Sequence, residues 1–418
     1  MITILDTVRA GDQPWQVEAV ALAENTYPAA LLEQVAMGSV VIMQRGKRLT
    51  GIGRGLRTKV NVNLGTSSTK VSLADELGKA AIAETFGADT ISDLSMGGDI
   101  DAIREEILIR TTLPVTTVPV YQTVVEKGLS GMTEKDILTT MRKQAEQGVS
   151  SFVVHCVTGK MLDEVRKRKR VLGIVSKGGS MTSAHMLLNQ CENPFIEHYD
   201  EILSLCREHD IVLSLGNTAR SGCIHDRRDK IQLEELGTNI AFARRAHEAG
   251  VQVIIEGCGG HIRGDRISRY IRAYKNASPF PLFVAGPLPT DIAAGYDHIA
   301  GCAGASLASA AGADYLCYLT PAEHLGLPGP SAVKEGLIAF RIAAHIGDTM
   351  KYGRDAEDRE IALMRAALDR EGQVRKALDP ARAAELCGNE PECTMCGEHC
   401  AIRIMKELDR GTPAKKGH

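Results

Sequence analysis

The sequence predicts an α/β protein built on a (β/α)8 barrel of the TIM type, with a helical cap before the barrel and a helical segment after it. Short runs rich in β-branched residues recur about every 30 residues between 58 and 320, mostly with helical periodicity between them, as repeated strand and helix units require. Aromatic residues make up only 4% of the chain, and its 41 glycines allow helices to pack closely on parallel strands.

Residues 1–55 are expected to form an N-terminal cap with two helical stretches. Pro28 is placed to begin the second stretch, because proline is favoured at the first position of a helix. The glycines between residues 46 and 55 are expected to break the chain before the barrel begins.

Residues 56–350 are expected to form the barrel, with its substrate and metal site. Nine candidate strands compete for eight positions, at 59–64, 90–94, 115–121, 152–157, 171–176, 211–216, 251–256, 282–285 and 315–319. The connection between the fourth and fifth candidates holds only one short basic helix, at 163–170. One of those two candidates is therefore expected to lie outside the barrel.

Residues 351–418 are expected to form a C-terminal helical segment, following an apolar helix at 331–351. A charged helical stretch runs to Leu378, and Asp379 with Pro380 is placed to open another short helix. The tail beyond Cys400 ends in Gly-Thr-Pro-Ala-Lys-Lys-Gly-His and is expected to be disordered.

The composition favours a soluble, cytoplasmic protein that acts on a small molecule. The 49 basic and 52 acidic residues give a net charge of −3, which argues against a nucleic-acid or anionic-membrane partner. No apolar run approaches the length of a membrane span. The 11 cysteines are an odd number and are mostly scattered singly, which favours reduced thiols and a metal site over a secreted disulfide framework.

The most specific local pattern is three thiols, Cys393, Cys396 and Cys400, within eight residues. A 4Fe-4S cluster held by three cysteines keeps one iron open, and S-adenosylmethionine can chelate that iron and be cleaved reductively there. The alternative is a structural zinc site with His399 or Cys387 as the fourth ligand, which the spacing also permits.

A second group of polar side chains follows the predicted strands, where barrel enzymes place their active sites. These residues are Asn61, Asn63, Asp93, Tyr121, His155, Asn217, Arg220, Glu256, His261, Glu323 and His324. The turn Ser176-Lys177-Gly178-Gly179-Ser180 precedes a helix expected to begin near Met181, so its amides and Lys177 could bind a phosphate.

His261 and His324 follow two late strands and could together hold a divalent metal with open positions. Two imidazoles with open positions suit zinc, iron, cobalt or manganese. Glu256 could then polarise or deprotonate a bound amine, whereas the alternative is that His324 only caps a turn.

Ordered blocks along nearly the whole chain resemble the phosphomethylpyrimidine synthase family, the radical enzymes of thiamin pyrimidine formation. They also resemble its close paralogue of anaerobic cobamide synthesis, 5-hydroxybenzimidazole synthase, which the departures described below favour. The blocks lie at 59–63, 88–90, 93–95, 118–122, 146–148, 173–179, 214–216, 290–298 and 320–328.

This resemblance implies a substrate, 5-aminoimidazole ribonucleotide, with its phosphate at Ser176, Lys177 and Gly178. The other substrate positions it implies are Asn63, Ser92, Tyr121, His155, Asn217, Arg220, Glu256 and Phe283, and Glu256 is also expected to be catalytic. It implies one divalent metal on His261 and His324, and a 4Fe-4S cluster with S-adenosylmethionine on the three tail cysteines. The radical made from S-adenosylmethionine would take hydrogen from the ribose and start a rearrangement.

The resemblance also implies partners. In relatives the cluster segment reaches over the barrel of a partner subunit, which predicts a homodimer. An electron donor such as flavodoxin or ferredoxin is expected to reduce the cluster.

The chain departs from the family pattern around the substrate and the metal. Relatives usually have Met, Arg, Asp and Tyr at the positions of Ser92, Lys177, Asn217 and Phe283. The metal motif before His261 has one extra residue, and three residues separate Cys396 from Cys400 where four are typical. A changed site on a kept scaffold favours a changed product.

We therefore expect a radical lyase that makes 5-hydroxybenzimidazole, with the thiamin pyrimidine phosphate as the alternative product. Two remoter hypotheses are a metal-dependent barrel hydrolase or aldolase with a structural zinc tail, and a protein that binds the ribonucleotide without turning it over.

Overall fold

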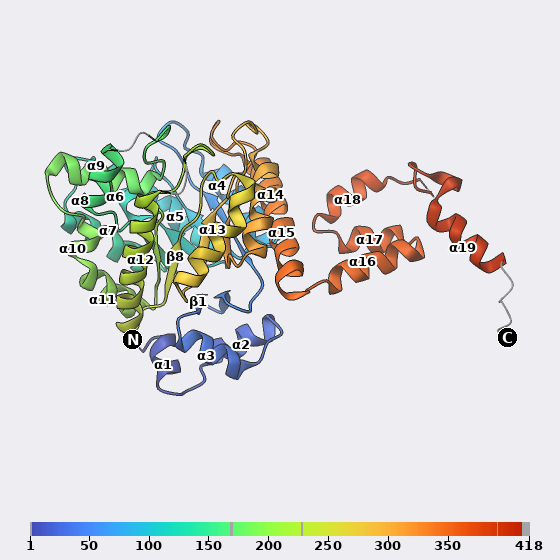
Figure 1. Ribbon diagram of the computed structural model, residues 1–418, viewed down its shortest axis with the longest axis horizontal. Helices are drawn as coiled ribbons and strands as arrows, with labels where there is room; N and C mark the ends of the chain where they lie inside the picture. Colours follow the sequence, from blue (N-terminus) through green and yellow to red (C-terminus); the bar gives the residue numbers. More distant parts are fainter. Residues whose placement is uncertain (1, 168–169, 227–228, 391, 412–418) are drawn as a thin grey trace. The chain divides into compact units, whose positions relative to one another are not determined.

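The computed structural model describes residues 2–167, 170–226, 229–390 and 392–411. The chain divides into two compact units, Met1–Tyr352 and Gly353–His418, which are described separately below. Figure 1 shows the barrel and its surrounding helices in the first unit and a series of helices in the second.

Eight parallel strands close into a barrel in the order β10-β3-β4-β5-β6-β7-β8-β9, which confirms the predicted TIM-type fold. They are β3 (Lys59–Leu64), β4 (Thr90–Asp93), β5 (Val115–Thr117), β6 (Ser151–Val154), β7 (Val212–Leu215), β8 (Val253–Glu256), β9 (Leu282–Ala285) and β10 (Tyr315–Cys317). The strands are short and buried, as expected for a parallel sheet covered by helices.

The connecting helices form an outer layer around the strands (Figure 1). They are α4 (Leu73–Thr85), α5 (Ile100–Arg110), α6 (Pro119–Lys127), α7 (Glu134–Glu146), α8 (Gly159–Lys167), α9 (Lys177–Asn189), α10 (Pro194–Glu197), α11 (Tyr199–His209), α12 (Lys230–Glu248), α13 (Gly264–Ala277), α14 (Asp297–Ala310) and α15 (Pro330–Tyr352). The predicted apolar helix at 331–351 corresponds to α15.

The fifth strand candidate, 171–176, is wrong, because β6 pairs directly with β7. The backbone N–H groups of Val171 and Leu172 donate to the two carboxylate oxygens of Asp226, at 2.8 and 3.0 Å. These donors are thus satisfied by a side chain and need no strand partner. Val171 is 71% exposed, so its β-branched side chain contributes no core.

The first 55 residues contain more structure than the sequence predicts. Three helices, α1 (Ile4–Arg9), α2 (Trp15–Ala23) and α3 (Pro28–Ala36), precede an antiparallel hairpin of β1 (Val40–Arg45) and β2 (Arg48–Gly53). Pro28 begins α3, as predicted. The expectation that the glycines break the chain is confirmed for Gly46 and Gly55, which lie in turns with φ of 56° and 82°, and wrong for Gly51 and Gly53, which lie within β2.

The hairpin closes the N-terminal end of the barrel. The side chain of Gln252, just before β8, accepts from the N–H of Ile42 at 2.7 Å and donates to its carbonyl at 3.1 Å. Ser150, just before β6, donates to the carbonyl of Gln44 at 2.9 Å. A small apolar core joins the hairpin to the barrel interior, formed by Val41, Met43, Ile52, Val212, Ile254, Phe283 and Tyr315.

The second unit consists of α16 (Ala356–Ala367), α17 (Arg370–Lys376), α18 (Pro380–Cys387), a 3-10 turn (Gly397–His399) and α19 (Ala401–Gly411). Asp379 caps α18 by accepting from the N–H of Arg382 at 3.1 Å, as its position before Pro380 predicts. The expectation of disorder beyond Cys400 is wrong for Ala401–Gly411, a helix of mostly good helix formers. The remainder of that expectation, at 412–418, lies outside the described residues.

Within the described part of the chain, every helix is too short or too polar to cross a bilayer.

Candidate active site

A cavity of about 420 Å³ opens at the C-terminal ends of the barrel strands. Every barrel residue predicted to bind substrate or metal lines it, except Gly178 and Asn217. The predicted residues in its wall are Asn63, Ser92, Tyr121, His155, Ser176, Lys177, Arg220, Glu256, His261, Phe283 and His324. The parallel strands thus bring together side chains that are spread over more than 260 positions of the sequence.

The floor of the cavity is held by a hydrogen-bond network between strands β3 and β4. The Asn61 Oδ1 atom accepts from Thr90 at 2.9 Å and from Ser92 at 3.1 Å, and its amide nitrogen donates to Asn63 at 2.8 Å. Below this layer the ring of Phe283 stacks on Tyr315, with centroids 4.0 Å apart. The floor is therefore a rigid surface on which a planar ligand could rest.

Cys317 is a wall residue that the sequence analysis missed. Its sulfur accepts from the Asn63 amide nitrogen at 3.0 Å, and burial raises the pKa of its thiol to about 12. Tyr315, two residues earlier on β10, points into the barrel. The two-residue periodicity of strands places Cys317 on the same inward side, so this signal was present in the sequence.

The predicted phosphate-binding turn is the first turn of α9. The helix begins at Lys177, not near Met181 as predicted, because the Ser176 hydroxyl caps it by accepting from the Gly179 N–H at 3.2 Å. A Cβ atom at Gly178 would lie 2.4 Å from the His155 ring, so only glycine fits there. The helix start, Lys177 and the nearby cavity form a suitable anion site.

His155 is a buried, neutral imidazole. Its Nε2 atom lies 3.1 Å from the Ser176 hydroxyl, and its Nδ1 atom has no partner within the described residues. Burial, together with the positive charge of Arg220, lowers its pKa to about 3. At neutral pH the ring therefore carries one N–H donor and one free acceptor.

Tyr121 lies beside the anion site. The predicted strand 115–121 ends at Thr117, and Pro119 begins α6, so Tyr121 projects from the first turn of this helix. The Lys177 ammonium lies 5.4 Å from the centre of its ring. Burial raises the pKa of Tyr121 to about 12, so the phenol keeps its proton.

Glu256 provides an acid or base in the cavity wall. Ser214 donates to its Oε1 atom at 3.0 Å. Burial raises its pKa, while the Ser214 hydrogen bond and Arg220 partly oppose that shift. A carboxyl with a raised pKa can exchange a proton with a bound amine.

Asn217 points away from the cavity, toward Glu235 of α12. Its amide donates to the Glu235 carboxylate at 2.6 Å, and the N–H groups of Thr218 and Ala219 donate to the same carboxylate at 2.5 and 3.0 Å. Burial raises the pKa of Glu235 to about 7. The Glu235 carboxylate shapes the loop that carries Arg220. No pattern in the sequence indicated this contact.

His261 and His324 converge, with their Nε2 atoms 3.4 Å apart. The backbone before His261 is left-handed at Cys258 and Gly260, with φ of 54° and 82°. The His261 N–H donates to the carbonyl of Ser221 at 3.0 Å, which fixes the start of the loop. Two neighbouring imidazole nitrogens on a cavity wall fit a divalent metal that has open positions.

The three predicted cluster cysteines lie on a turn in the second unit. The N–H groups of Cys396 and Gly397 donate to the Cys393 carbonyl at 3.2 and 2.8 Å. Backbone N–H groups of Met395 and Cys396 lower the pKa of the Cys393 thiol, whereas desolvation and the neighbouring Cys393 and Cys400 thiols raise the pKa of Cys396. Cys393 and Cys396 are exposed and Cys400 is half-buried, and the cluster on these three thiols stays a prediction.

No closed metal site with three or more His, Cys, Asp or Glu ligands is formed by the described residues.

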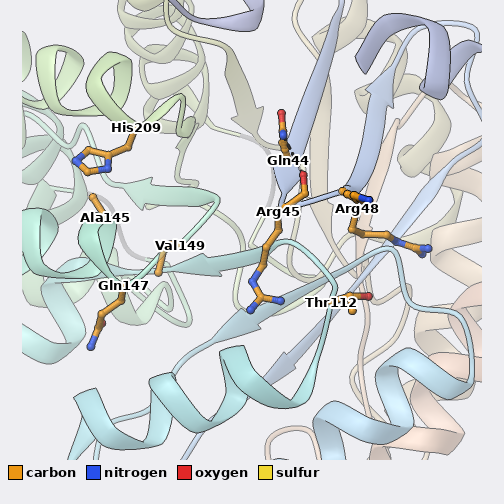
Figure 2. A pocket seen from close by; sticks show the side chains of 11 residues that line it. Gln44, Arg45, Arg48, Thr112, Ala145, Gln147, Val149 and His209 are labelled. Carbon is orange, nitrogen blue, oxygen red and sulfur yellow. Dashed lines mark hydrogen bonds between the residues drawn. The ribbon is translucent and has the colours of Figure 1, made fainter. Parts of the chain in front are cut away.

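A second cavity, of about 770 Å³, lies at the opposite end of the barrel (Figure 2). Arg45 and Arg48 reach it from the hairpin, and Gln147 and His209 from the other side. The Arg45 guanidinium is already used by the carbonyls of Leu108 and Thr111 at the end of α5. This cavity contains none of the predicted site residues.

Comparison with known proteins identifies the family of the chain. The Radical SAM ThiC family matches residues 3–407. The phosphomethylpyrimidine synthase of Dehalococcoides mccartyi strain BAV1 is 43% identical over 423 residues, covering 97% of this chain and 98% of the relative. The protein of the same name from Pyrobaculum aerophilum is 42% identical over 426 residues, covering 98% of this chain and 99% of the relative.

Among solved structures, phospho-2-dehydro-3-deoxyheptonate aldolase from Thermotoga maritima is 14% identical, with a TM-score of 0.40, and the match covers 77% of this chain and 75% of that one. The family match and the full-length relatives extend over both the barrel and the cysteine turn. The chain therefore belongs to the radical SAM ThiC family of enzymes, which use S-adenosylmethionine and an iron–sulfur cluster.

Proposed function

We propose that this enzyme is a phosphomethylpyrimidine synthase, which rearranges 5-aminoimidazole ribonucleotide to the pyrimidine phosphate of thiamin. The observation that carries this proposal is the similarity to enzymes of that name, at 43% identity over 97% of the chain. This similarity outweighs the substitutions around the site, which favour the benzimidazole product, because those relatives are similar along their whole length.

The substrate phosphate binds at the start of α9. The backbone there offers N–H groups beside the Ser176 cap, and Lys177 adds a positive charge that burial has partly desolvated. The aminoimidazole then lies over the cavity floor within reach of Glu256, whose raised pKa suits proton exchange with an exocyclic amine. Neutral His155 orients the ribose through its free ring nitrogen.

S-adenosylmethionine and a 4Fe-4S cluster on Cys393, Cys396 and Cys400, when bound, supply the carbon radical that takes hydrogen from the substrate. The protein's part is to hold the ribonucleotide rigidly and keep water away. The buried walls of the cavity and the Asn61 network serve this purpose. His261 and His324 would hold a divalent metal, zinc or iron being the first choices, that binds a substrate or product oxygen or nitrogen.

A second candidate product is 5-hydroxybenzimidazole. It is favoured by Ser92, Lys177 and Phe283, which line the cavity and replace the Met, Arg and Tyr usual in the family. A smaller side chain at 92 and a ring without hydroxyl at 283 change the shape and polarity of the floor. Such changes could redirect the same radical to another product.

Anaerobic turnover distinguishes the two products. The reconstituted enzyme is given reductant, S-adenosylmethionine and 5-aminoimidazole ribonucleotide, and the products are identified by mass spectrometry. We expect the pyrimidine phosphate and 5′-deoxyadenosine. Detection of 5-hydroxybenzimidazole instead would select the second candidate, and no consumption of S-adenosylmethionine would refute both.

The three-cysteine cluster is tested by Cys396→Ala, with the exposed Cys191→Ala as control. Cys396→Ala should lose the absorbance at about 400 nm and all cleavage of S-adenosylmethionine, while Cys191→Ala keeps both. A structural zinc tail predicts instead that the purified protein contains zinc in place of iron. It also predicts turnover of a hydrolase substrate, and this activity would remain in Cys396→Ala.

We propose further that the enzyme acts as a homodimer and takes electrons from a flavodoxin or ferredoxin. Sedimentation at working concentration and reduction of the cluster by purified flavodoxin test these two partners.

A further inference from the structure

The two imidazoles that converge on the cavity each have a carboxylate behind them. The His261 Nδ1 atom lies 2.6 Å from the Asp291 Oδ1 atom, and the His324 Nδ1 atom lies 3.7 Å from the Asp297 Oδ2 atom. Their Nε2 atoms face each other at 3.4 Å. Both rings therefore direct their Nε2 atom to the cavity and their Nδ1 atom to a carboxylate.

Asp291 is itself held in place. Its second oxygen accepts from the backbone N–H of Ile224 at 3.0 Å, so the carboxylate links the loop after β7 to His261, which follows β8. His261 is anchored at its own N–H by Ser221 of the same loop. Both the carboxylate and the ring it faces therefore have little freedom to rotate.

Asp297 is the first residue of α14, and its side chain is only 7% exposed. Its Oδ2 atom has no hydrogen-bond partner within the described residues. A buried carboxylate oxygen without a donor is unfavourable, so a strong donor is needed close by. The Nδ1 atom of His324 lies 3.7 Å from this oxygen, and the His324 backbone is left-handed at φ 61°, a conformation uncommon for residues other than glycine.

Histidines that bind metals usually donate their other ring N–H to a carboxylate, which fixes the tautomer, orients the ring and makes the free nitrogen more basic. We propose that Asp291 and Asp297 are positioning residues that hold the Nε2 atoms of His261 and His324 toward one shared divalent cation. This inference rests on the metal of the proposed function. It adds that the affinity for this metal depends on two acids that do not touch it.

The two acids should contribute unequally. Asp291 makes a short contact and is fixed at both oxygens, whereas the Asp297 contact, at 3.7 Å, is longer than a hydrogen bond. Asp297 also lies in the first turn of α14, where a negative charge stabilises the helix in any case. A purely structural role would therefore lower stability without changing metal affinity.

The test is zinc affinity of the full chain, measured by competition with a chelator. Cys393, Cys396 and Cys400 are changed to Ser in every sample, so that the tail thiols take no zinc. Asp291→Asn and Asp297→Asn keep shape and remove the charge. Asp265→Asn, at an exposed acid paired with Arg263, is the matched control, and His261→Ala marks complete loss of the site.

We expect Asp291→Asn to weaken zinc binding by about 10-fold to 100-fold and Asp297→Asn by less. The control should bind as the parent does. A second readout is the rise in melting temperature on adding zinc, which should shrink in the two variants while their metal-free melting temperatures stay close to that of the parent.

Two results would overturn the proposal, and they differ in whether they also refute the metal site of the proposed function. Zinc affinity unchanged in both Asp variants, with loss in His261→Ala, would refute the positioning role and leave the metal site of the proposed function intact. Equal zinc binding by the parent and His261→Ala would refute both.

Discussion

Among single residues, Glu235 shows how this site is built around groups that never meet the ligand. Three donors from Asn217, Thr218 and Ala219 converge on its carboxylate, and burial holds its pKa at about 7. An aspartate at position 217 would face Glu235 with like charge, whereas the Asn217 amide can donate to it.

The pKa of Glu235 predicts a pH dependence of stability. The carboxyl titrates at about 7 in the folded protein but near its ordinary value of 4.5 when unfolded. Between these values the folded state binds more protons, so the free energy of unfolding falls as the pH rises. This effect amounts to at most about 3 kcal/mol between pH 4.5 and 7.

Glu235→Gln removes that titration. In urea unfolding followed by circular dichroism, its stability relative to wild type should improve as the pH is raised from 4.5 to 7. The exposed Glu371→Gln serves as control. A constant difference between Glu235→Gln and wild type across this range would show that Glu235 is ionised throughout.

The residues of the site were predictable where they follow strands and unpredictable where loops determine the contact. Tyr121, His155 and Glu256 come after recognisable strands, so their convergence follows from the barrel itself. The partners of Asp291 and Glu235 depend on the path of the β7 to α12 loop, which no periodicity encodes.

At the level of elements, α9 and the β1–β2 hairpin set the two ends of the barrel. The start of α9 lies against His155 so closely that Gly178 has no room for a side chain. Strand β2 of the hairpin packs equally closely against α2, since a Cβ atom at Gly51 would lie 2.4 Å from the Val20 side chain. In both elements glycine allows close approach of backbone to a neighbour.

Gly178→Ala should disturb the anion site. Its Cβ would displace the His155 ring, break the contact with Ser176, and cost about 1 to 3 kcal/mol of stability. We expect the KM for the ribonucleotide to rise at least tenfold in steady-state assays.

The matched control is Gly237→Ala, an exposed position in α12 with no atom near the added methyl group. It should stabilise the protein by about 0.5 to 1 kcal/mol and leave KM unchanged. Normal KM and stability in Gly178→Ala would show that the α9 turn is looser than its geometry indicates.

Gln252→Ala should loosen the hairpin. The substitution leaves the N–H and carbonyl of buried Ile42 without their partner, at a cost of about 2 kcal/mol or more. Urea unfolding measures this loss. Gln13→Ala, which removes only an exposed contact with Glu18, should change stability by less than about 0.5 kcal/mol. Equal losses of stability in the two variants would contradict the role of Gln252 in holding the hairpin against the barrel.

Eight of the nine strand candidates were correct because β-branched runs at regular spacing are a strong signal for buried parallel strands. The candidate at 171–176 failed because Asp226, 50 or more positions away, satisfies its backbone N–H groups. The hairpin was missed because Gly51 and Gly53 looked like chain breakers, although they are required by the close approach of α2 and Ser39.

At the scale of the whole molecule, the cavity and the cysteine turn belong to different compact units. Residues 1–352 contain the barrel, the hairpin and the complete cavity, whereas the cysteine turn belongs to residues 353–418. Each unit has its own internal contacts. Substrate recognition and cluster binding should therefore be separable.

A chain ending at Tyr352 tests this separation. It should melt cooperatively, within a few degrees of the full chain by circular dichroism, because the barrel core is complete without the second unit. It should take up no iron and cleave no S-adenosylmethionine. An unfolded or aggregated product would show that the barrel needs the second unit to fold.

The hairpin under the barrel has a consequence for the handling of reactive species. Because apolar side chains of the hairpin pack against Val212, Ile254 and Tyr315 inside the barrel, the protein itself closes that end, whereas the cavity opens at the carboxyl ends of the strands. A radical formed in this cavity would thus be shielded from dioxygen on the hairpin side at all times. Further cover during turnover would be needed at the carboxyl ends of the strands.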